Sequence, residues 1–571
     1  MSRRAPLLSA AIILFSIDPG TANCQTSEEQ LEQYFRAGQM AMQQGQFAAA
    51  ADDFKKVLQL DPTLVEAQVN LGLAYQELLQ YEDAIRYLAK ALHARPNLLA
   101  PNVIVGMDYL KLGSPEKGIP FLEAALKLDP SNPEAHEALA STYLAQDNFG
   151  GAAEQFRRLA ELNPDKPEAL FKLGHEYLDL SARLAYRGAR LYRESAWGHR
   201  FLGDLLAQRD RWQEAIDEYQ KALAAAPQQP GLHATMGDAY FHLQKFEQAE
   251  AEFRSELHVD PESEPALQGL ANTAAARNQT APSREQTPAA APGNDADQDP
   301  CKAHQYARCI ASLENRKHPT DSQWLMLGKA HLSLRQYGPA AEALAQVRGT
   351  SPDNEEASYW LEQTYQALGA ETYAQLEQSF PDSWRTHQLR AEGYALRGKF
   401  PDALKEFEAA LALRPNEPEL HEALGELYLD NNKFESARAE LEQTLSIDAE
   451  RTHALYLIGR IYVVQKENEK AVPYLERALR IQPDMPEANS LLGTAYLRLG
   501  QYANAVSRLE KAASSDHYGN VHYQLYVAYG KLGQPERAKK ELLISQDLRK
   551  SHLERDQAVV MGSQQVETEP Q

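Results

Sequence analysis

Small, apolar and aromatic side chains recur along this chain at a fixed interval of about 34 residues. Prolines mark the period in the first part of the sequence, at Pro62, Pro96, Pro130 and Pro164. Three other classes of position keep step with them: glycines (Gly38, Gly72, Gly106 and Gly174), tyrosines (Tyr75, Tyr109, Tyr143 and Tyr177) and small residues (Ala50, Ala84, Gly118 and Ala152). A period held at so many positions predicts a stack of similar units.

Each recurring residue has a packing role in a pair of helices. Glycine or alanine at the eighth position of a unit, and the small residue at the twentieth, let two helices approach closely. The aromatic residue at the eleventh position fills the space between them. Proline ends the second helix because it cannot continue one and biases its predecessor away from helical angles. The pattern therefore predicts two packed helices in each unit.

These positions resemble the pattern of the tetratricopeptide repeat. The resemblance implies an all-α fold, an α–α superhelix or solenoid, in which antiparallel helix pairs stack. It covers most of the chain after residue 26, with two repeat blocks. Units are expected to start near Leu31, Val65, Leu99, Pro133, Ala196 and Pro230, with a half unit from Glu264, and then near Asp321, Trp384, Pro418, Thr452, Pro486 and Gly519.

Two units break the period in the same way. Those over residues 167–195 and 355–383 are both shorter than the period and equal in length, and Trp197 or Trp384 follows as the regular phase resumes. Both keep a regular first helix, whereas their second helices lack the small-residue signature. Because neighbour contacts set the geometry of a solenoid, we expect each irregular unit to bend or re-pitch the stack. Their likeness leads to the hypothesis that the two blocks arose by duplication of one longer module.

Composition sets the boundaries of the blocks. Residues 27–276 form the first repeat block and residues 301–550 the second. The segment 277–300 is rich in Pro, Ala, Gln and Asp with almost no apolar residues, which predicts a flexible, disordered linker. Residues 551–571 are expected to form a charged capping segment and a disordered tail.

The N-terminus has the three-part pattern of an export signal. Arg3 and Arg4 precede an apolar run over residues 7–17, and small residues predict cleavage after Ala22. That run is shorter than the roughly 20 residues that span a bilayer, so no transmembrane segment is expected in the mature chain. We expect a bacterial protein that is exported, to the periplasm or as a secreted protein. The residues before Cys24 do not match a lipobox, which argues against a lipoprotein.

The net charge narrows the range of partners, and the cysteine content narrows the range of folds. The formal net charge of −22 opposes nucleic acid as a partner, because phosphate backbones attract dense positive charge. Three cysteines exclude a disulfide-rich fold. A disulfide between Cys301 and Cys309 is one interpretation. It requires Cys301 to lie before the helix that holds Cys309, because eight helical residues rise about 12 Å. Two reduced thiols are the alternative.

Motifs that carry chemistry are sparse. The sequence holds no glycine-rich phosphate loop, nucleophile elbow or paired-histidine zinc helix. His136 and His421 begin sequences that resemble the start of a zinc-protease motif but lack its second histidine, so we interpret them as repeat residues on the groove side. Cys301, His304, Cys309 and His318 match no common zinc spacing. The sequence thus predicts no catalytic residue, metal, cofactor or small-molecule substrate.

The candidate partner-binding residues lie on the first helix of each unit. Its second, fifth, ninth and twelfth positions share one face, which lines the concave groove where proteins of this family hold partners. These positions give an apolar stripe (Val69, Leu73, Val103, Met107 and Leu110) and an acidic patch (Glu419, Glu422, Glu426 and Asp430) followed by Tyr456, Arg460 and Val463. The alternatives are packing between helices for the stripe and a merely solvated face for the patch.

The sequence therefore predicts a non-catalytic scaffold that binds partner proteins or peptides in its grooves, in envelope assembly or secretion. Two alternatives stay open. One is a substrate-presenting subunit of an enzyme system, of the kind that serves glycosyltransferases or polysaccharide export. The other is a structural spacer, for which the chemistry of the groove would not matter.

Overall fold

A computed structural model describes residues 25–261, 263–277, 301, 305–314, 316–516 and 518–565, with side chains from Glu28 to Lys550. The predicted export signal, Cys24, His304, nearly all of the predicted linker and the last six residues lie outside this part of the chain. The described residues form helices and connecting turns only. The expected all-α fold is confirmed.

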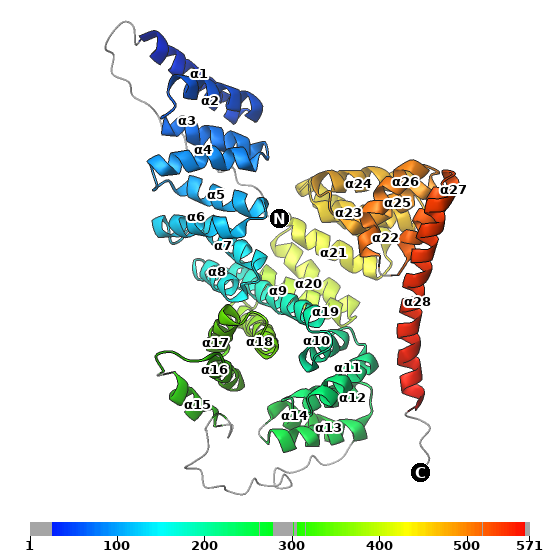
Figure 1. Ribbon diagram of the computed structural model, residues 1–571. Coiled ribbons are helices and arrows are strands. Elements are labelled where there is room, and N and C mark those ends of the chain that lie inside the picture. Colours follow the sequence, from blue (N-terminus) through cyan, green and yellow to red (C-terminus); the bar gives the residue numbers. More distant parts are fainter. Residues whose placement is uncertain are drawn as a thin grey trace. The chain divides into compact units, whose positions relative to one another are not determined.

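Antiparallel helix pairs follow one another along the chain (Figure 1). Before residue 278 the helices are α1 (Gln25–Gln43), α2 (Phe47–Leu60), α3 (Val65–Glu77), α4 (Tyr81–Ala94), α5 (Leu99–Lys111), α6 (Pro115–Leu128), α7 (Pro133–Ala145), α8 (Phe149–Glu161), α9 (Pro167–Leu191), α10 (Ala196–Ala207), α11 (Trp212–Ala225), α12 (Leu232–His242), α13 (Phe246–Val259) and α14 (Glu264–Ala276). After residue 300 they are α15 (Tyr306–Leu313), α16 (Asp321–Ser333), α17 (Tyr337–Thr350), α18 (Glu355–Ser379), α19 (Trp384–Leu396), α20 (Phe400–Leu413), α21 (Pro418–Asp430), α22 (Phe434–Ile447), α23 (Thr452–Val464), α24 (Asn468–Ile481), α25 (Pro486–Arg498), α26 (Tyr502–Ala512), the 3₁₀ turn η3 (Ala513–Ser515), α27 (Asn520–Lys531) and α28 (Pro535–Gln565). None of the described helices combines the length and apolar character needed to cross a membrane.

The glycine at the eighth position packs as predicted. A Cβ atom on Gly72 would lie 2.5 Å from Leu88 Cγ, and one on Gly459 would lie 2.5 Å from Leu475 Cγ. Both leucines come from the second helix of the same unit and are fully buried. The turn between the two helices also recurs, with a left-handed residue at the fifteenth position, for example Gly45, Leu79 and Gly113. The helix pair is therefore closed by a fixed turn and a fixed glycine–leucine contact.

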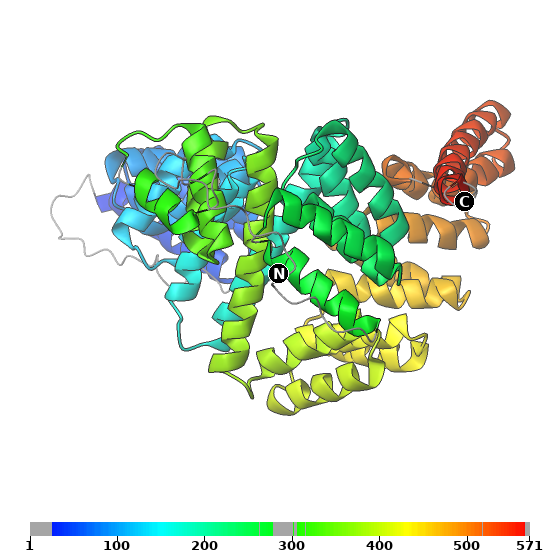
Figure 2. The same ribbon diagram turned by 90° about the horizontal axis from the view of Figure 1, so that it is seen from below.

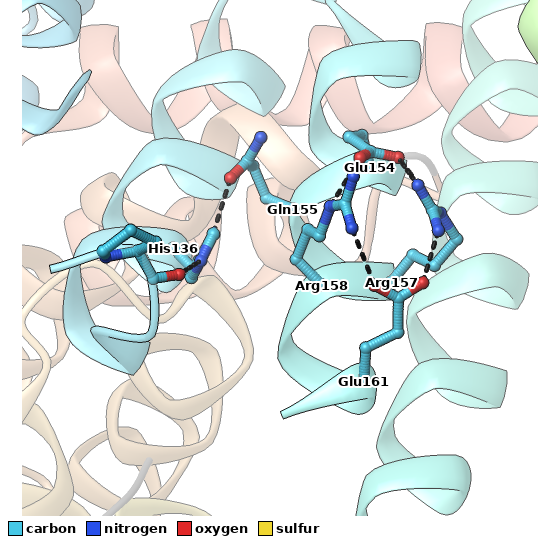
Figure 3. Close-up of polar contacts among 7 residues, drawn as sticks. His136, Glu154, Gln155, Arg157, Arg158 and Glu161 are labelled. Atoms are coloured by element: carbon cyan, nitrogen blue, oxygen red, sulfur yellow. Dashed lines mark hydrogen bonds and ion pairs between the residues drawn. The ribbon is translucent and has the colours of Figure 1, made fainter. Parts of the chain in front are cut away.

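In several units the histidine at the fourth position joins the two helices of its own unit. Figure 3 shows this for His136. His136 is hydrogen-bonded to Gln155 Oε1 at 2.7 Å and to the Pro130 carbonyl at 3.0 Å. The same 19-residue spacing joins His199 to Glu218, His233 to Glu252, His387 to Glu406, His421 to Glu440 and His522 to Glu541. Our interpretation of His136 and His421 as groove residues is therefore wrong, because both rings are turned toward the second helix of their own unit.

Figure 3 also shows the outer face of α8. There Arg157 and Arg158 each form ion pairs with both Glu154 and Glu161, which lie two turns of helix apart. Pairs of this kind on an exposed helix contribute only a few tenths of a kcal/mol each, about 0.3–0.5 kcal/mol. The network is therefore a solvated helix face and not a functional cluster.

The two irregular units differ from the prediction. Each is one unbroken helix of 25 residues, α9 or α18, and not a pair of helices. Figure 2 shows α18, in yellow-green, as a single long helix. Ser181 and Gly369 occupy the fifteenth position, where regular units turn, and both are helical. The expectation of a separate second helix is wrong because the chain does not turn at these two positions.

Helices α9 and α18 pack against each other. The rings of Tyr177 and Tyr365 stack with their centroids 6.1 Å apart, and Ser181 Oγ donates to Glu362 Oε1 at 2.8 Å. Tyr365 is fully buried, in an apolar cluster that holds side chains from both sides of the linker. The two repeat blocks therefore dock on each other through their irregular helices.

The docked helices are related by approximate two-fold symmetry. Helices α7 to α10 start at residues 133, 149, 167 and 196, and α16 to α19 repeat the same spacing, with starts at 321, 337, 355 and 384. When these two series are aligned, Tyr177 matches Tyr365, Ser181 matches Gly369 and Gly174 matches Glu362. Ser181 contacts Glu362, and Gly174 O lies 3.3 Å from where a Cβ of Gly369 would be. These reciprocal contacts are those of a self-complementary interface.

A buried polar cluster lies beside this junction. The Asp204 carboxylate accepts hydrogen bonds from Tyr219 (2.7 Å) and Tyr359 (3.0 Å), and the Arg200 guanidinium lies over the Tyr359 ring at 4.2 Å. Glu362 is 2% exposed. Burial raises the pKa of Glu362 to about 7, and the charge of Asp204 adds to the effect. The junction thus contains a carboxyl group that ionises only at a cost in stability.

The chain divides into two compact units. One comprises residues 1–205, 218–238 and 246–372, and the other comprises residues 206–217, 239–245 and 373–571. The first unit thus contains helices from both sides of the linker. The divisions between the units fall within α10, α11, α12 and α18 and just before α13.

Cys301 and Cys309 form a disulfide. Cys301 precedes α15, which begins at Tyr306, so the geometric condition set by the helix rise is met. Cys309 is buried among Ile310, Leu313 and Leu327. Within the described residues, no group of three His, Cys, Asp or Glu side chains is arranged to hold a metal ion.

Candidate partner-binding surface

The apolar stripe lies partly in the core. Val103 is 3% exposed and packs against Ala125 and Ala135 of the following helices, so it is not accessible to a partner. Placing Val103 in the groove was wrong, because its side chain packs against Ala135 on the first helix of the next unit. Val69, Leu73, Met107 and Leu110 are half-buried. Val69 and Leu73 pack against the cluster around Leu88 and Ile104, so part of their apolar surface belongs to the core.

Three of the four acidic residues of the patch in the second block already have partners: Glu419, Glu422 and Glu426, the last with Oε1 3.5 Å from His453 Nε2. Glu422 on α21 is 7% exposed, accepts a hydrogen bond from His453 Nδ1 at 2.8 Å and also contacts Arg451. Glu419 accepts from Arg385 at 2.8 Å. Glu422 therefore links α21 to the start of α23 and is not an open ligand group.

The pKa values reflect these contacts. Burial alone would raise the pKa of Glu422, but hydrogen bonds from His453 and Arg451 outweigh burial and lower it. The same hydrogen bond raises the pKa of His453, against the opposing effect of burial. Burial raises the pKa of Glu426, and the neighbouring charges of Glu422 and Asp430 add to it while His453 and Arg460 oppose it.

Four residues make up the accessible surface on α21 and α23: Asp430, Tyr456, Arg460 and the partly accessible Glu426. We call them the first-helix surface. Asp430 and Arg460 are exposed, and Glu426 and Tyr456 are half-buried. The Tyr456 ring stacks on His453, with centroids 5.9 Å apart and planes 21° from parallel. The surface combines an anionic end, an aromatic ring and a guanidinium group, which can bind a polar peptide reversibly.

His453 and Arg451 are the functional neighbours that the sequence reasoning missed. His453 occupies the second position of its unit, which is one of the groove positions, so the repeat phase could have found it. Arg451 lies just before the helix and carries no such signal. Its contact with Glu422 depends on how two successive units stack.

Family models match long stretches of the chain. Models described as "Tetratricopeptide repeat" match residues 206–272, 394–461 and 462–517, residues 106–175 and 178–230, and residues 65–98, and one described as "TPR repeat" matches residues 38–78. Together these segments span more than half of the chain. No curated protein matches it.

Several solved structures show a likeness to parts of this chain. The crystal structure of MamA is 22% identical over 29% of this chain and 96% of its own length, with a TM-score of 0.27. YrrB, titled "a TPR protein with an unusual peptide-binding site", is 19% identical over 34% of this chain and 99% of its own, with a TM-score of 0.29. Pseudomonas aeruginosa pilF is 14% identical over 45% and 99%, with a TM-score of 0.30. At these values the likeness carries no information on partners.

Proposed function

Because this chain belongs to the tetratricopeptide-repeat family, we propose that it is an exported, non-catalytic scaffold that holds partner proteins or peptides on its first-helix surface, in envelope assembly or secretion. Proteins of this family bind other proteins through their repeats. The export pattern of residues 1–22 supports the location. The Cys301–Cys309 disulfide fits an oxidising compartment.

The observation that carries the proposal is the composition of the first-helix surface. Asp430 and Glu426 offer acceptors for a basic or amide group, whereas Arg460 offers donors for a carboxylate or a backbone carbonyl. The Tyr456 ring, on the same helix as Arg460, provides a flat apolar contact. The elements that carry them are fixed below by the Glu422–His453 and Glu422–Arg451 contacts, so the surface is preorganised and little order has to be gained on binding.

Charge reversal of Arg460 tests this proposal. Arg460→Glu places a third negative charge beside Glu426 and Asp430, so recovery of the partner from envelope extract should fall by at least about tenfold. Arg480→Glu is the matched control, because Arg480 is exposed on the second helix α24 and the substitution changes the net charge equally. Quantitative mass spectrometry of captured proteins is the measurement.

Equal recovery by the wild type and both variants would contradict the proposal and favour a structural spacer. A substrate-presenting subunit predicts a different result, namely that Arg460→Glu lowers turnover by an associated enzyme while the enzyme is still captured. Circular dichroism of each variant checks that the helices are retained.

A further inference from the structure

His453 is placed differently from the histidines that join the two helices of one unit. Those lie at the fourth position of a unit and bond to the second helix of the same unit. His453 lies at the second position, and its hydrogen-bond partner is Glu422 on the first helix of the preceding unit. Its side chain is 46% exposed, so solvent and a partner can both reach the ring. His453 is therefore a titratable group at the edge of the first-helix surface.

The ring lies between two carboxylates of α21 that differ in accessibility. Nδ1 is 2.8 Å from Glu422 Oε1, and Nε2 is 3.5 Å from Glu426 Oε1. Glu422 is buried and also pairs with Arg451, whereas the side chain of Glu426 is 46% exposed. A partner therefore has access to Glu426 but not to Glu422, and any cation that it brings to Glu426 meets the imidazole there.

Charged groups from the neighbouring elements surround His453. Two pairs among them are matched, namely Arg385 with Glu419 and Arg451 with Glu422. The other charged groups that act on this surface are Glu426 and Asp430 on α21, Arg460 on α23 and Glu487 on α25. With a neutral His453, three carboxylates thus stand against one guanidinium, and the surface attracts a cationic group. A protonated His453 places a positive charge beside the carboxylate that such a group would bind.

The two glutamates favour the protonated ring. The hydrogen bond to Glu422 raises the pKa of His453, the charges of Glu426 and Glu422 add to the rise, and burial and Arg451 oppose it. Below this raised pKa the imidazolium is paired with both carboxylates. Above it the ring is neutral, so the Glu426 carboxylate has lost that cation and accepts one from a partner.

We propose that His453 makes binding at the first-helix surface depend on pH, because its protonated ring competes with a lysine or arginine side chain of the partner for Glu426. This inference rests on the proposed function and adds the regulation of the same surface. The partner segment that fits carries a basic side chain for Glu426 and Asp430 and an acidic one for Arg460. Residues i and i+2 of an extended chain point to the same side about 7 Å apart, so a Lys-x-Glu segment supplies both.

Two substitutions of His453 that fix its charge test the proposal. The probe is the pentapeptide acetyl-Ser-Lys-Ser-Glu-Ser-amide, titrated by calorimetry into the full-length protein at pH 6 and pH 8.5 at low salt, because salt screens these charges. The wild type should bind the probe at least about fivefold more tightly at pH 8.5 than at pH 6. His453→Gln removes the charge and keeps a donor for Glu422, so at pH 6 it should bind at least about threefold more tightly than the wild type. His453→Lys carries a permanent charge and should bind weakly at both pH values.

His233→Gln is the matched control. His233 also bonds through Nδ1 to a glutamate, Glu252, at 2.7 Å, and this hydrogen bond raises its pKa. It lies on α12 in the other compact unit, so this variant should keep the pH dependence of the wild type. The peptide acetyl-Ser-Gln-Ser-Glu-Ser-amide lacks the lysine and should bind no more tightly at pH 8.5 than at pH 6.

The coupling between the proton and the peptide acts in both directions. Saturating probe should therefore lower the pKa of His453, measured by NMR of carbon-13-labelled histidine. The inference is overturned if the wild type does not bind the probe, if it binds equally at both pH values, or if His453→Gln shows the same pH dependence as the wild type. A wild type that captures its partner through Arg460 without any of these pH effects would retain the proposed function and lose this inference.

Discussion

Replacing Glu362 by glutamine should leave stability unchanged at pH 4.5 and raise the free energy of unfolding by about 3 kcal/mol at pH 8. Burial at the α9–α18 junction raises the pKa of this carboxyl from its ordinary 4.5 to about 7. A group whose pKa is raised on folding stabilises the folded state below its unfolded pKa. That contribution is lost as the pH rises from about 4.5 through 7. Glutamine keeps an acceptor for Ser181 and has no charge to bury.

Chemical denaturation of both proteins at pH 4.5, 6 and 8 measures the effect. Glu371→Gln is the matched control, because Glu371 lies on the same helix and is exposed, and it should differ little from the wild type at all three values. A Glu362→Gln variant that is no more stable than the wild type at pH 8 would show that the carboxyl is not buried as described.

Replacing Gly198 by alanine should destabilise the protein by about 3 kcal/mol or more. A Cβ atom at this position would lie 1.7 Å from the carbonyl oxygen of Tyr192 and 2.3 Å from its carbonyl carbon. Both are backbone atoms at the end of α9, so a side-chain rotation cannot relieve the overlap. Overpacking of this kind usually costs about 1–3 kcal/mol even where side chains can move. Helix α10 would have to shift, and with it Arg200 and Asp204.

Gly349→Ala is the matched control for that substitution. Gly349 is an exposed helical residue, and a Cβ atom there would have no neighbour within 4 Å. Alanine has the higher helix propensity, so this variant should gain up to about 1 kcal/mol. Thermal denaturation followed by circular dichroism distinguishes the two, and a Gly198→Ala variant as stable as Gly349→Ala would contradict the packing described for α9 and α10.

Local packing could be predicted from the sequence because it depends on residues close together in the chain. Gly72 and Leu88 lie within one unit, and their contact follows from the position of the glycine in the repeat. The same holds for the boundaries of most helices, since proline and the turn residue recur with the period. The fourth-position histidines could have been recognised too, because their partners always follow 19 residues later.

The other features of the fold and of the candidate site depend on contacts that the 34-residue period does not predict. Ser181 and Gly369 sit where a regular unit turns, and Ser181 meets Glu362 from the other block, 181 residues away in sequence. Val103 is buried because it packs against Ala135 of the next unit. Tyr359 reaches Asp204 only because the two blocks dock. None of these contacts can be predicted from the spacing of residues within a single repeat.

The central claim is that two repeat blocks dock through α9 and α18 to make one scaffold. Cutting the chain between the blocks tests it most directly, with an engineered protease site inserted after Ala289. After cleavage, size-exclusion chromatography at micromolar concentration should show both halves in one peak of unchanged volume, and Tyr365→Ala should split that peak by leaving a cavity at the junction. Separation of the wild-type halves after cleavage would contradict the claim.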